Sequence, residues 1–118
     1  MNGKIIQSVL LENKIRPNIK GYKYCFEILK ILCSKDLRLN EVYFEVAKRF
    51  DIKANSIEKS VSNAIAKAFL EQDMQQRYAK LCWKTGKVNN KKFIFLLKKQ
   101  VLMHNSKALP NINSYGFI

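Results

Sequence analysis

The stretch VYFEVAKRFDIKANSIEKSVSNAIAKAF, residues 42–69, decides the fold, because its apolar residues recur every three or four positions in two blocks. That spacing predicts two helices joined by a tight turn. We expect the first helix to run from Glu41 to about Asp51 and the second from residue 55 or 56 to about residue 70. The predicted buried residues are Val42 or Tyr43, Val46, Ala47 and Phe50 on the first helix and Ile57, Val61, Ala64, Ile65 and Ala68 on the second.

The residues at the two predicted helix starts are of types that cap helices. Asn40 precedes the first helix, and its side chain can accept a hydrogen bond from an orphan backbone N–H. Asn55 or Ser56 is expected to cap the second helix, with Glu58 in the first turn, where the helix dipole favours an acid. Asp51 falls at a turn position where the helix-turn-helix motif commonly has glycine, and Asp adopts the required backbone less readily.

Opposite its apolar stripe, the second helix carries small polar side chains and one lysine. Such a slim face suits close approach to base edges in the major groove of DNA. Asn63 could bond an adenine through two hydrogen bonds, and Lys59 could reach a guanine or a phosphate. The alternative is an amphipathic hairpin whose polar face simply meets water. The candidate base-reading residues are Asn55, Ser56, Lys59, Ser62 and Asn63.

The charge of the chain favours a polyanionic partner. The 118 residues carry a formal net charge of +13, with a pI near 9.8. Residues 1–73 hold 13 basic and 9 acidic side chains, whereas residues 74–118 hold 9 basic side chains and no acid. Nucleic acid is the commonest partner of such a surface. A merely solvated surface is the alternative, but a C-terminal third without a carboxylate favours a basic surface that faces phosphates. The candidate phosphate contacts are Lys48, Arg49, Lys53 and Lys67 near the second helix and Lys84, Lys87, Lys91 and Lys92 in the basic C-terminal third.

The rest of the chain predicts further helices around the hairpin. A short helix is expected over residues 5–13, a central helix over 21–34, a short helix within 72–83 and a last long helix from residue 89 or 90 to about 104. The sequence thus predicts an all-α fold, a compact bundle of about six helices with a helix-turn-helix at about residues 41–70. Residues 1–104 would form one domain, and residues 105–118 a C-terminal tail.

Several classes of function have little support in the sequence. Cys25, Cys33 and Cys82 form no CxxC pair, and His104 is the only histidine, so neither a metal site nor a disulfide framework is expected. The nine acids form no evident pair with His104, and no glycine-rich phosphate loop is present, so we expect no enzyme, no catalytic residue, no cofactor and no small-molecule ligand. No apolar run is long enough to span a bilayer. The three cysteines are most simply free thiols in a reducing cytosol, so we expect a cytoplasmic protein, associated with the nucleoid through DNA.

Two other binding functions compete with DNA recognition. A helical protein-interaction module could bind an acidic protein partner through the same lysines, without reading DNA. RNA binding is the second rival, but the aromatic residues fall on apolar stripes and do not gather on a sheet or loop where they could stack on bases.

Most of the chain to about residue 104 resembles the C-terminal DNA-binding domain of stage-zero sporulation protein A, the response regulator that initiates sporulation. The segments that carry the resemblance are IRPNIKGYKY (residues 15–24) and YFEVAKRFDIKANSIEKSVSNAIAKAF (residues 43–69); NNKKFIFLLKKQVLMH (residues 89–104) is similar more loosely. The resemblance implies an all-helical domain and regulation of transcription by sequence-specific binding of double-stranded DNA through the helix at residues 55–69. It also implies binding of two copies on tandem sites, as a possible homodimer.

The chain departs from the family in its reading residues and in its length. Glu58 and Lys59 keep the family's character, whereas Ser56 and Ser62 stand where arginine is expected and Asn63 where histidine is expected. The resemblance therefore implies the fold and mode of binding more firmly than the target sequence. The family's regulator also has a receiver domain with a phosphorylatable aspartate, which this sequence lacks. We expect a small stand-alone homologue rather than an excised domain.

Overall fold

The computed structural model describes residues 3–81 and 88–107, and these form helices and connecting turns without a β-strand. The all-α prediction is therefore confirmed, with six α-helices and one short 3₁₀ helix in the described residues. Their bounds are α1 Gly3–Glu12, α2 Tyr22–Ser34, α3 Leu39–Phe50, α4 Ala54–Ala68, α5 Gln72–Arg77, the 3₁₀ helix η1 Ala79–Leu81 and α6 Asn90–Lys107.

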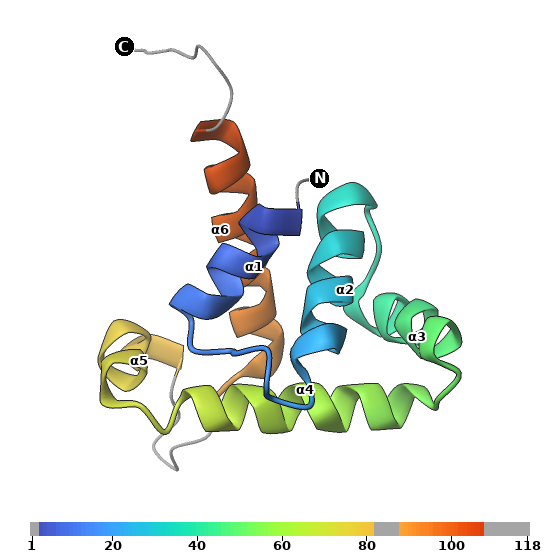
Figure 1. Cartoon of the computed structure of the whole chain (residues 1–118), viewed down its shortest axis with the longest axis horizontal. Helices are drawn as coiled ribbons and strands as arrows, with labels where there is room; N and C mark the ends of the chain where they lie inside the picture. Colours follow the sequence, from blue (N-terminus) through green and yellow to red (C-terminus); the bar gives the residue numbers. More distant parts are fainter. Residues whose placement is uncertain (1–2, 82–87, 108–118) are drawn as a thin grey trace.

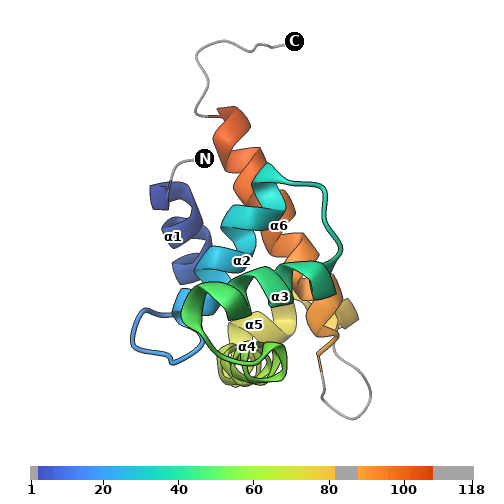
Figure 2. The same cartoon turned by 90° about the vertical axis from the view of Figure 1, so that its right-hand side faces the viewer.

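Helix α2 is the centre of the bundle, as its apolar pattern predicted. It packs against α1, α3, α4 and α6. Helix α4 lies along one edge of the molecule, and α2 and α6 rise from it toward the opposite edge (Figure 1). Helix α3 crosses near the start of α4, and in Figure 2 α4 is seen end-on beneath α3. This arrangement buries one face of α4 along its length and leaves the opposite face at the edge.

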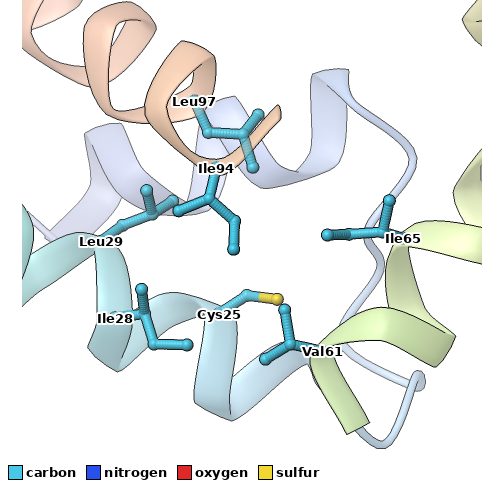
Figure 3. A pocket seen from close by; sticks show the side chains of 7 residues that line it. All are labelled: Cys25, Ile28, Leu29, Val61, Ile65, Ile94 and Leu97. Atoms are coloured by element: carbon cyan, nitrogen blue, oxygen red, sulfur yellow. The ribbon is translucent and has the colours of Figure 1, made fainter. Parts of the chain in front are cut away.

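The core forms where α2, α4 and α6 meet. The expected stripe of α4 is buried throughout, and so are Val42, Tyr43, Val46 and Ala47 of α3. Figure 3 shows seven apolar side chains from the three helices pointing at a common centre, where a cavity of about 10 Å³ is left. Its lining is apolar, so the cavity does not attract water. The lining residues are Cys25, Ile28 and Leu29 from α2, Val61 and Ile65 from α4, and Ile94 and Leu97 from α6.

Gly21 fixes the distance between α2 and α4. A Cβ atom at this position would lie 2.5 Å from the carbonyl oxygen of Ser60 and 3.0 Å from the Cβ of Ala64. Real Cβ atoms do not approach backbone oxygens so closely, so only glycine allows the start of α2 to sit on the backbone of α4. The glycine of the IKGY segment therefore has a packing role in placing α4.

The first turns of α3 and α4 differ from the predicted caps. Helix α3 begins at Leu39. The Glu41 carboxylate, in the first turn, accepts a hydrogen bond of 2.9 Å from the N–H of Arg38, the residue before the helix, as the acid of a capping box does. The Asn40 side chain accepts a hydrogen bond of 3.0 Å from the orphan N–H of Glu41, as predicted, but it does so from within the first turn and not from the position before the helix.

Helix α4 begins at Ala54, one residue before the earlier of the two predicted starts. Its first turn closes on the Lys53 carbonyl, which accepts hydrogen bonds from the N–H groups of Ser56 and Ile57. No side chain caps this helix, so the prediction that Asn55 or Ser56 does so is wrong. Helix α6 extends to Lys107, beyond its predicted end at about residue 104, while residues 108–118 of the predicted tail lie outside the described residues.

A buried polar cluster ties α1 to the C-terminal half of the chain. Asn13 is completely buried, and its Nδ2 donates to the Val9 carbonyl at 2.7 Å and to Oε1 of Gln100 at 2.8 Å. The Tyr78 hydroxyl donates to Oδ1 of Asn13 and accepts at 2.8 Å from Nε2 of Gln100. The three side chains thus satisfy one another where α1, α5 and α6 converge.

Candidate nucleic-acid interface

The turn between α3 and α4 has the backbone that a helix-turn-helix requires. Asp51 adopts the left-handed conformation, with φ 54° and ψ 48°. The N–H of Ile52 donates to the Ala47 carbonyl at 3.0 Å, and that of Asp51 donates to the Lys48 carbonyl at 3.3 Å. This pair of bonds is the Schellman motif, which ends a helix sharply and redirects the chain. Asp51 therefore occupies the position where glycine is common, as the sequence indicated.

The outer face of α4 presents three of the five predicted base-reading residues. Ser56, Lys59 and Asn63 are exposed and lie on the side away from the core. They are followed by Ala66 and Lys67, which are exposed as well. Because this face lies along an edge of the molecule, a partner can approach it without meeting another helix (Figure 1).

The other two predicted base-reading residues lie toward the flank of α4 that faces α6. The hydroxyl of Ser62 is half-buried and accepts a hydrogen bond of 3.0 Å from Nδ2 of Asn90. Asn55 is exposed but lines a groove that α4 shares with α3 and α6. Ser62 thus joins the start of α6 to α4, and Asn55 stands at the edge of the outer face.

The predicted phosphate-contacting cations of the motif lie toward the two ends of α4. Lys48 and Lys53 are exposed on either side of the turn at Asp51, and both line a hollow of about 570 Å³ there. Arg49 is exposed too, but its guanidinium makes an ion pair of 2.5 Å with Glu27 of α2. Lys67 is exposed near the C-terminal end of α4. The predicted phosphate contacts of the motif therefore lie near the two ends of α4, and Arg49 is held by Glu27.

The basic C-terminal third contributes a second group of cations. Lys91 and Lys92 are exposed in the first turn of α6, next to Asn90, which bonds to Ser62 of α4. Lys84 and Lys87 lie outside the described residues. The start of α6 thus brings positive charge to the flank of α4.

One cation near α4 was not among the predicted contacts. Lys20 is exposed and directly precedes Gly21, whose backbone rests on Ser60 and Ala64 of α4. This lysine belongs to the IKGY segment that carries the family resemblance, so that segment could have indicated Lys20 as a cation near α4.

Neither a metal site nor a membrane span is found in the part of the chain that the structure describes. No group of three or more His, Cys, Asp or Glu side chains there is placed to hold a metal ion. No helix of residues 3–81 and 88–107 is long and apolar enough to cross a membrane. The single His104 has its Nε2 3.5 Å from Oε1 of Glu12, an exposed pair between α6 and α1 that the sequence had not indicated.

Comparison with known proteins identifies the family of this arrangement. Residues 6–101 match the family model described as sporulation initiation factor Spo0A C terminal. No curated protein and no solved structure matches the chain. The matched residues run from α1 into α6 and include the whole helix-turn-helix. The chain therefore belongs to the Spo0A C-terminal family, the domains with which a sporulation response regulator binds double-stranded DNA.

Proposed function

We propose that this protein is a transcriptional regulator that binds double-stranded DNA in a sequence-specific manner by inserting α4 into the major groove. The observation that carries the proposal is the outer face of α4, which presents Ser56, Lys59 and Asn63 at an edge of the molecule with cations around it. A helix held by a turn of this kind is the element that enters the groove in helix-turn-helix proteins.

The exposed residues of α4 divide into two roles under this proposal. Asn63 and Lys59 contact base edges, since an amide pairs with adenine and an ammonium with guanine. Ser56 and Asn55 contact bases or sugar at the N-terminal end of the helix. Ser62 contributes from the flank, where its bond to Asn90 holds its hydroxyl in place.

The cations around α4 hold the protein on the DNA backbone. Lys48, Arg49 and Lys53 reach the phosphates beside the start of α4, and Lys67 reaches those beside its C-terminal end. Lys91 and Lys92 contact the flanking phosphates on the α6 side, to which Lys84 and Lys87 would add. We further propose that two copies bind tandem sites as a homodimer, and that the protein acts at the nucleoid in the cytoplasm.

The assignment of α4 is tested by selecting bound duplexes from a random pool and then comparing variants. The double variant Lys59→Ala/Asn63→Ala should lower the ratio of affinities for the selected and a scrambled duplex at least about tenfold, because each good base contact discriminates by about 1–3 kcal/mol. Weak binding to any duplex should persist through the surrounding lysines. Fluorescence anisotropy measures both affinities.

The matched control is Lys30→Ala, which removes one charge from the half of α2 that points away from α4. It should leave the ratio unchanged. Unaltered discrimination in the double variant would show that another element reads the DNA, and a pool without any enriched sequence would argue against specific recognition altogether.

A further inference from the structure

A groove separate from the reading face runs beside the start of α4. It encloses about 770 Å³ between the segment that leads into α3, the first turns of α3 and α4, and the first half of α6. Leu37, Tyr43, Phe44 and Phe95 supply its apolar surface. Burial and the nearby Glu58 carboxylate raise the pKa of Tyr43 to about 12, so its hydroxyl remains protonated. The groove thus places aromatic rings beside polar and charged side chains, which can fix the orientation of a bound molecule.

Phe44 is the most unusual residue of the groove. Its side chain is 61% exposed, whereas Phe69 and Phe93 are buried in the core. It also borders the hollow beside the turn, where Ile52 is exposed as well. A phenyl ring gains free energy when it leaves water. Nothing in the described fold covers this ring, so the gain is available to a ligand.

The rim of the groove carries more positive than negative side chains. Arg38, Lys91 and Lys98 line it, against Asp36 and Glu58. None of the three cations has an ion-pair partner among the described residues. The ammonium of Lys98 lies 5.7 Å from the centre of the Phe95 ring, so positive charge stands directly over the apolar surface. A ligand that suits both features has an apolar body and a negative group.

We propose that this groove binds a small amphipathic anion, with an aromatic body against Phe44 and Phe95 and a carboxylate or sulfonate near Lys91 and Lys98. The volume of the groove lies within the range of about 300–1,000 Å³ that is typical of ligand sites. The groove borders the proposed DNA interface, because Asn55 and Lys91 belong to both. Phe44, Phe95 and Lys98 belong to the groove and not to that interface.

Occupation of the groove opposes DNA binding. Ala54, Asn55 and Glu58 of α4 form one wall, so a bound anion places negative charge beside the helix that meets the DNA. It also takes Asn55 away from the bases. By linkage, DNA then weakens the binding of the anion by the same factor. The effect of the anion on DNA binding rests on the proposed function, whereas the binding of the anion itself does not.

The anion site is tested without DNA, using the fluorescence of 8-anilinonaphthalene-1-sulfonate as the probe. We expect a saturable rise in fluorescence with one probe per protein. The uncharged relative N-phenyl-1-naphthylamine should bind more weakly, by up to about fivefold, since one favourable charge contact at a surface contributes up to about 1 kcal/mol. Equal affinity for the two probes would overturn the role of the cations.

Matched variants locate the probe in the groove. Phe44→Ala should raise its Kd about tenfold, because an aromatic contact of this kind contributes about 0.5–1.5 kcal/mol beyond simple burial. The control Leu70→Ala removes a side chain that is 78% exposed outside the groove, and should have no effect. Lys98→Gln should weaken binding severalfold, whereas Lys99→Gln, on the neighbouring position outside this groove, should not. Equal effects within either pair would overturn the site.

Two further measurements test whether a second copy of the chain occupies the groove and whether the anion site is coupled to DNA binding. Sedimentation of the wild type and of Phe44→Ala should show the same species at every concentration; a self-association that the substitution abolishes would assign the groove to a second copy of the chain. With duplex DNA present, the probe should bind more weakly to the wild type. Unchanged binding of the probe would refute the coupling and leave the anion site standing, while probe binding without any DNA binding would refute the proposed function alone.

Discussion

At the scale of single residues, the close contact between Gly21 and α4 sets the orientation of the reading helix. The contact is made to the backbone of Ser60 and to the Cβ of Ala64, neither of which can rotate away as a long side chain would. Gly3 offers a comparison within the same chain, since a Cβ atom there would lie at an ordinary 3.4 Å from a Phe26 ring atom. The two glycines differ in what surrounds them, and only one is required by packing.

Substitution of Gly21 by alanine should therefore destabilise the protein by about 1–3 kcal/mol, the usual cost of forcing an extra carbon into a packed contact. Gly3→Ala serves as the control and should stay within about 0.5 kcal/mol of the wild type. Urea unfolding followed by circular dichroism measures both. Similar stabilities of the two variants would mean that α2 and α4 can separate without cost.

A second prediction at this scale concerns the pH dependence of stability. Burial raises the pKa of the Cys25 thiol from 9.0 to about 12. The neutral thiol therefore stabilises the folded state fully below pH 9, and this contribution is lost as the pH rises from 9 toward 12. The free energy of unfolding should fall in this range by up to about 1.4 kcal/mol per pH unit more in the wild type than in Cys25→Ala.

The measurement is urea unfolding at several pH values between 8 and 12, and the slope against pH is the readout, since Cys25→Ala also loses packing at every pH. Cys33 provides the control, because it is half-buried and its pKa is raised by less complete burial. Cys33→Ala should change the slope less than Cys25→Ala. Parallel plots of the free energy of unfolding against pH for the wild type and Cys25→Ala would contradict the raised pKa of the buried Cys25 thiol.

At the scale of helices, the cluster of Asn13, Tyr78 and Gln100 joins elements that are distant in sequence. Asn13 and Tyr78 are 65 residues apart, and Asn13 and Gln100 are 87 apart. The cluster satisfies a completely buried amide that would otherwise destabilise the fold. It thereby fixes the end of α1 against α6.

Removing the hydroxyl from the middle of this cluster should be costly. Tyr78→Phe leaves Oδ1 of Asn13 and Nε2 of Gln100 without their partner, and we expect a loss of about 1–3 kcal/mol. Tyr22→Phe is the control, because the half-buried Tyr22 hydroxyl makes no hydrogen bond to a described residue. The midpoints of thermal unfolding compare the two. A loss no larger than that of the control would show that water replaces the hydroxyl.

The helices of this fold could be predicted from the sequence, whereas the contacts between distant polar groups could not. The positions of α2, α3 and α4 follow from apolar residues at helical spacing. The left-handed backbone of Asp51 followed from its place in the turn that joins α3 to α4. The burial of Asn13 depends on Tyr78 and Gln100, and the bond of Ser62 depends on Asn90. Periodicity within one helix contains no information about such partners.

At the scale of the whole molecule, α4 lies at one edge and α6 leads away from it. Lys91 and Lys92 stand in the first turn of α6, next to Asn90, which bonds to Ser62 of α4. Lys98 and Lys99 lie about 10 Å farther along this helix, which rises about 1.5 Å per residue. Under the proposed function, DNA on the outer face of α4 would reach the first pair of lysines but not the second. The positive charge of the C-terminal third is therefore divided between two locations.

This division predicts different salt dependences for two double variants. Lys91→Gln/Lys92→Gln should reduce the slope of log affinity against log salt concentration by up to about 1.8, since each lost phosphate contact contributes about 0.9. Lys98→Gln/Lys99→Gln removes the same charge and should leave the slope nearly unchanged. Anisotropy titrations of duplex DNA over a range of salt concentrations measure it. Equal reductions would mean that the DNA follows α6 away from α4.

The contact at Gly21 also affects how relatives of this protein can be recognised. The glycine of IKGY is required by the distance between two helices, while Ser56, Lys59 and Asn63 face outward and are free of that constraint. A search that depends on this glycine will therefore select proteins with the same helix arrangement and, under the proposed function, leave their DNA targets unrestricted. Grouping those proteins by target requires a separate comparison of the outer positions of α4, made after the glycine has aligned them.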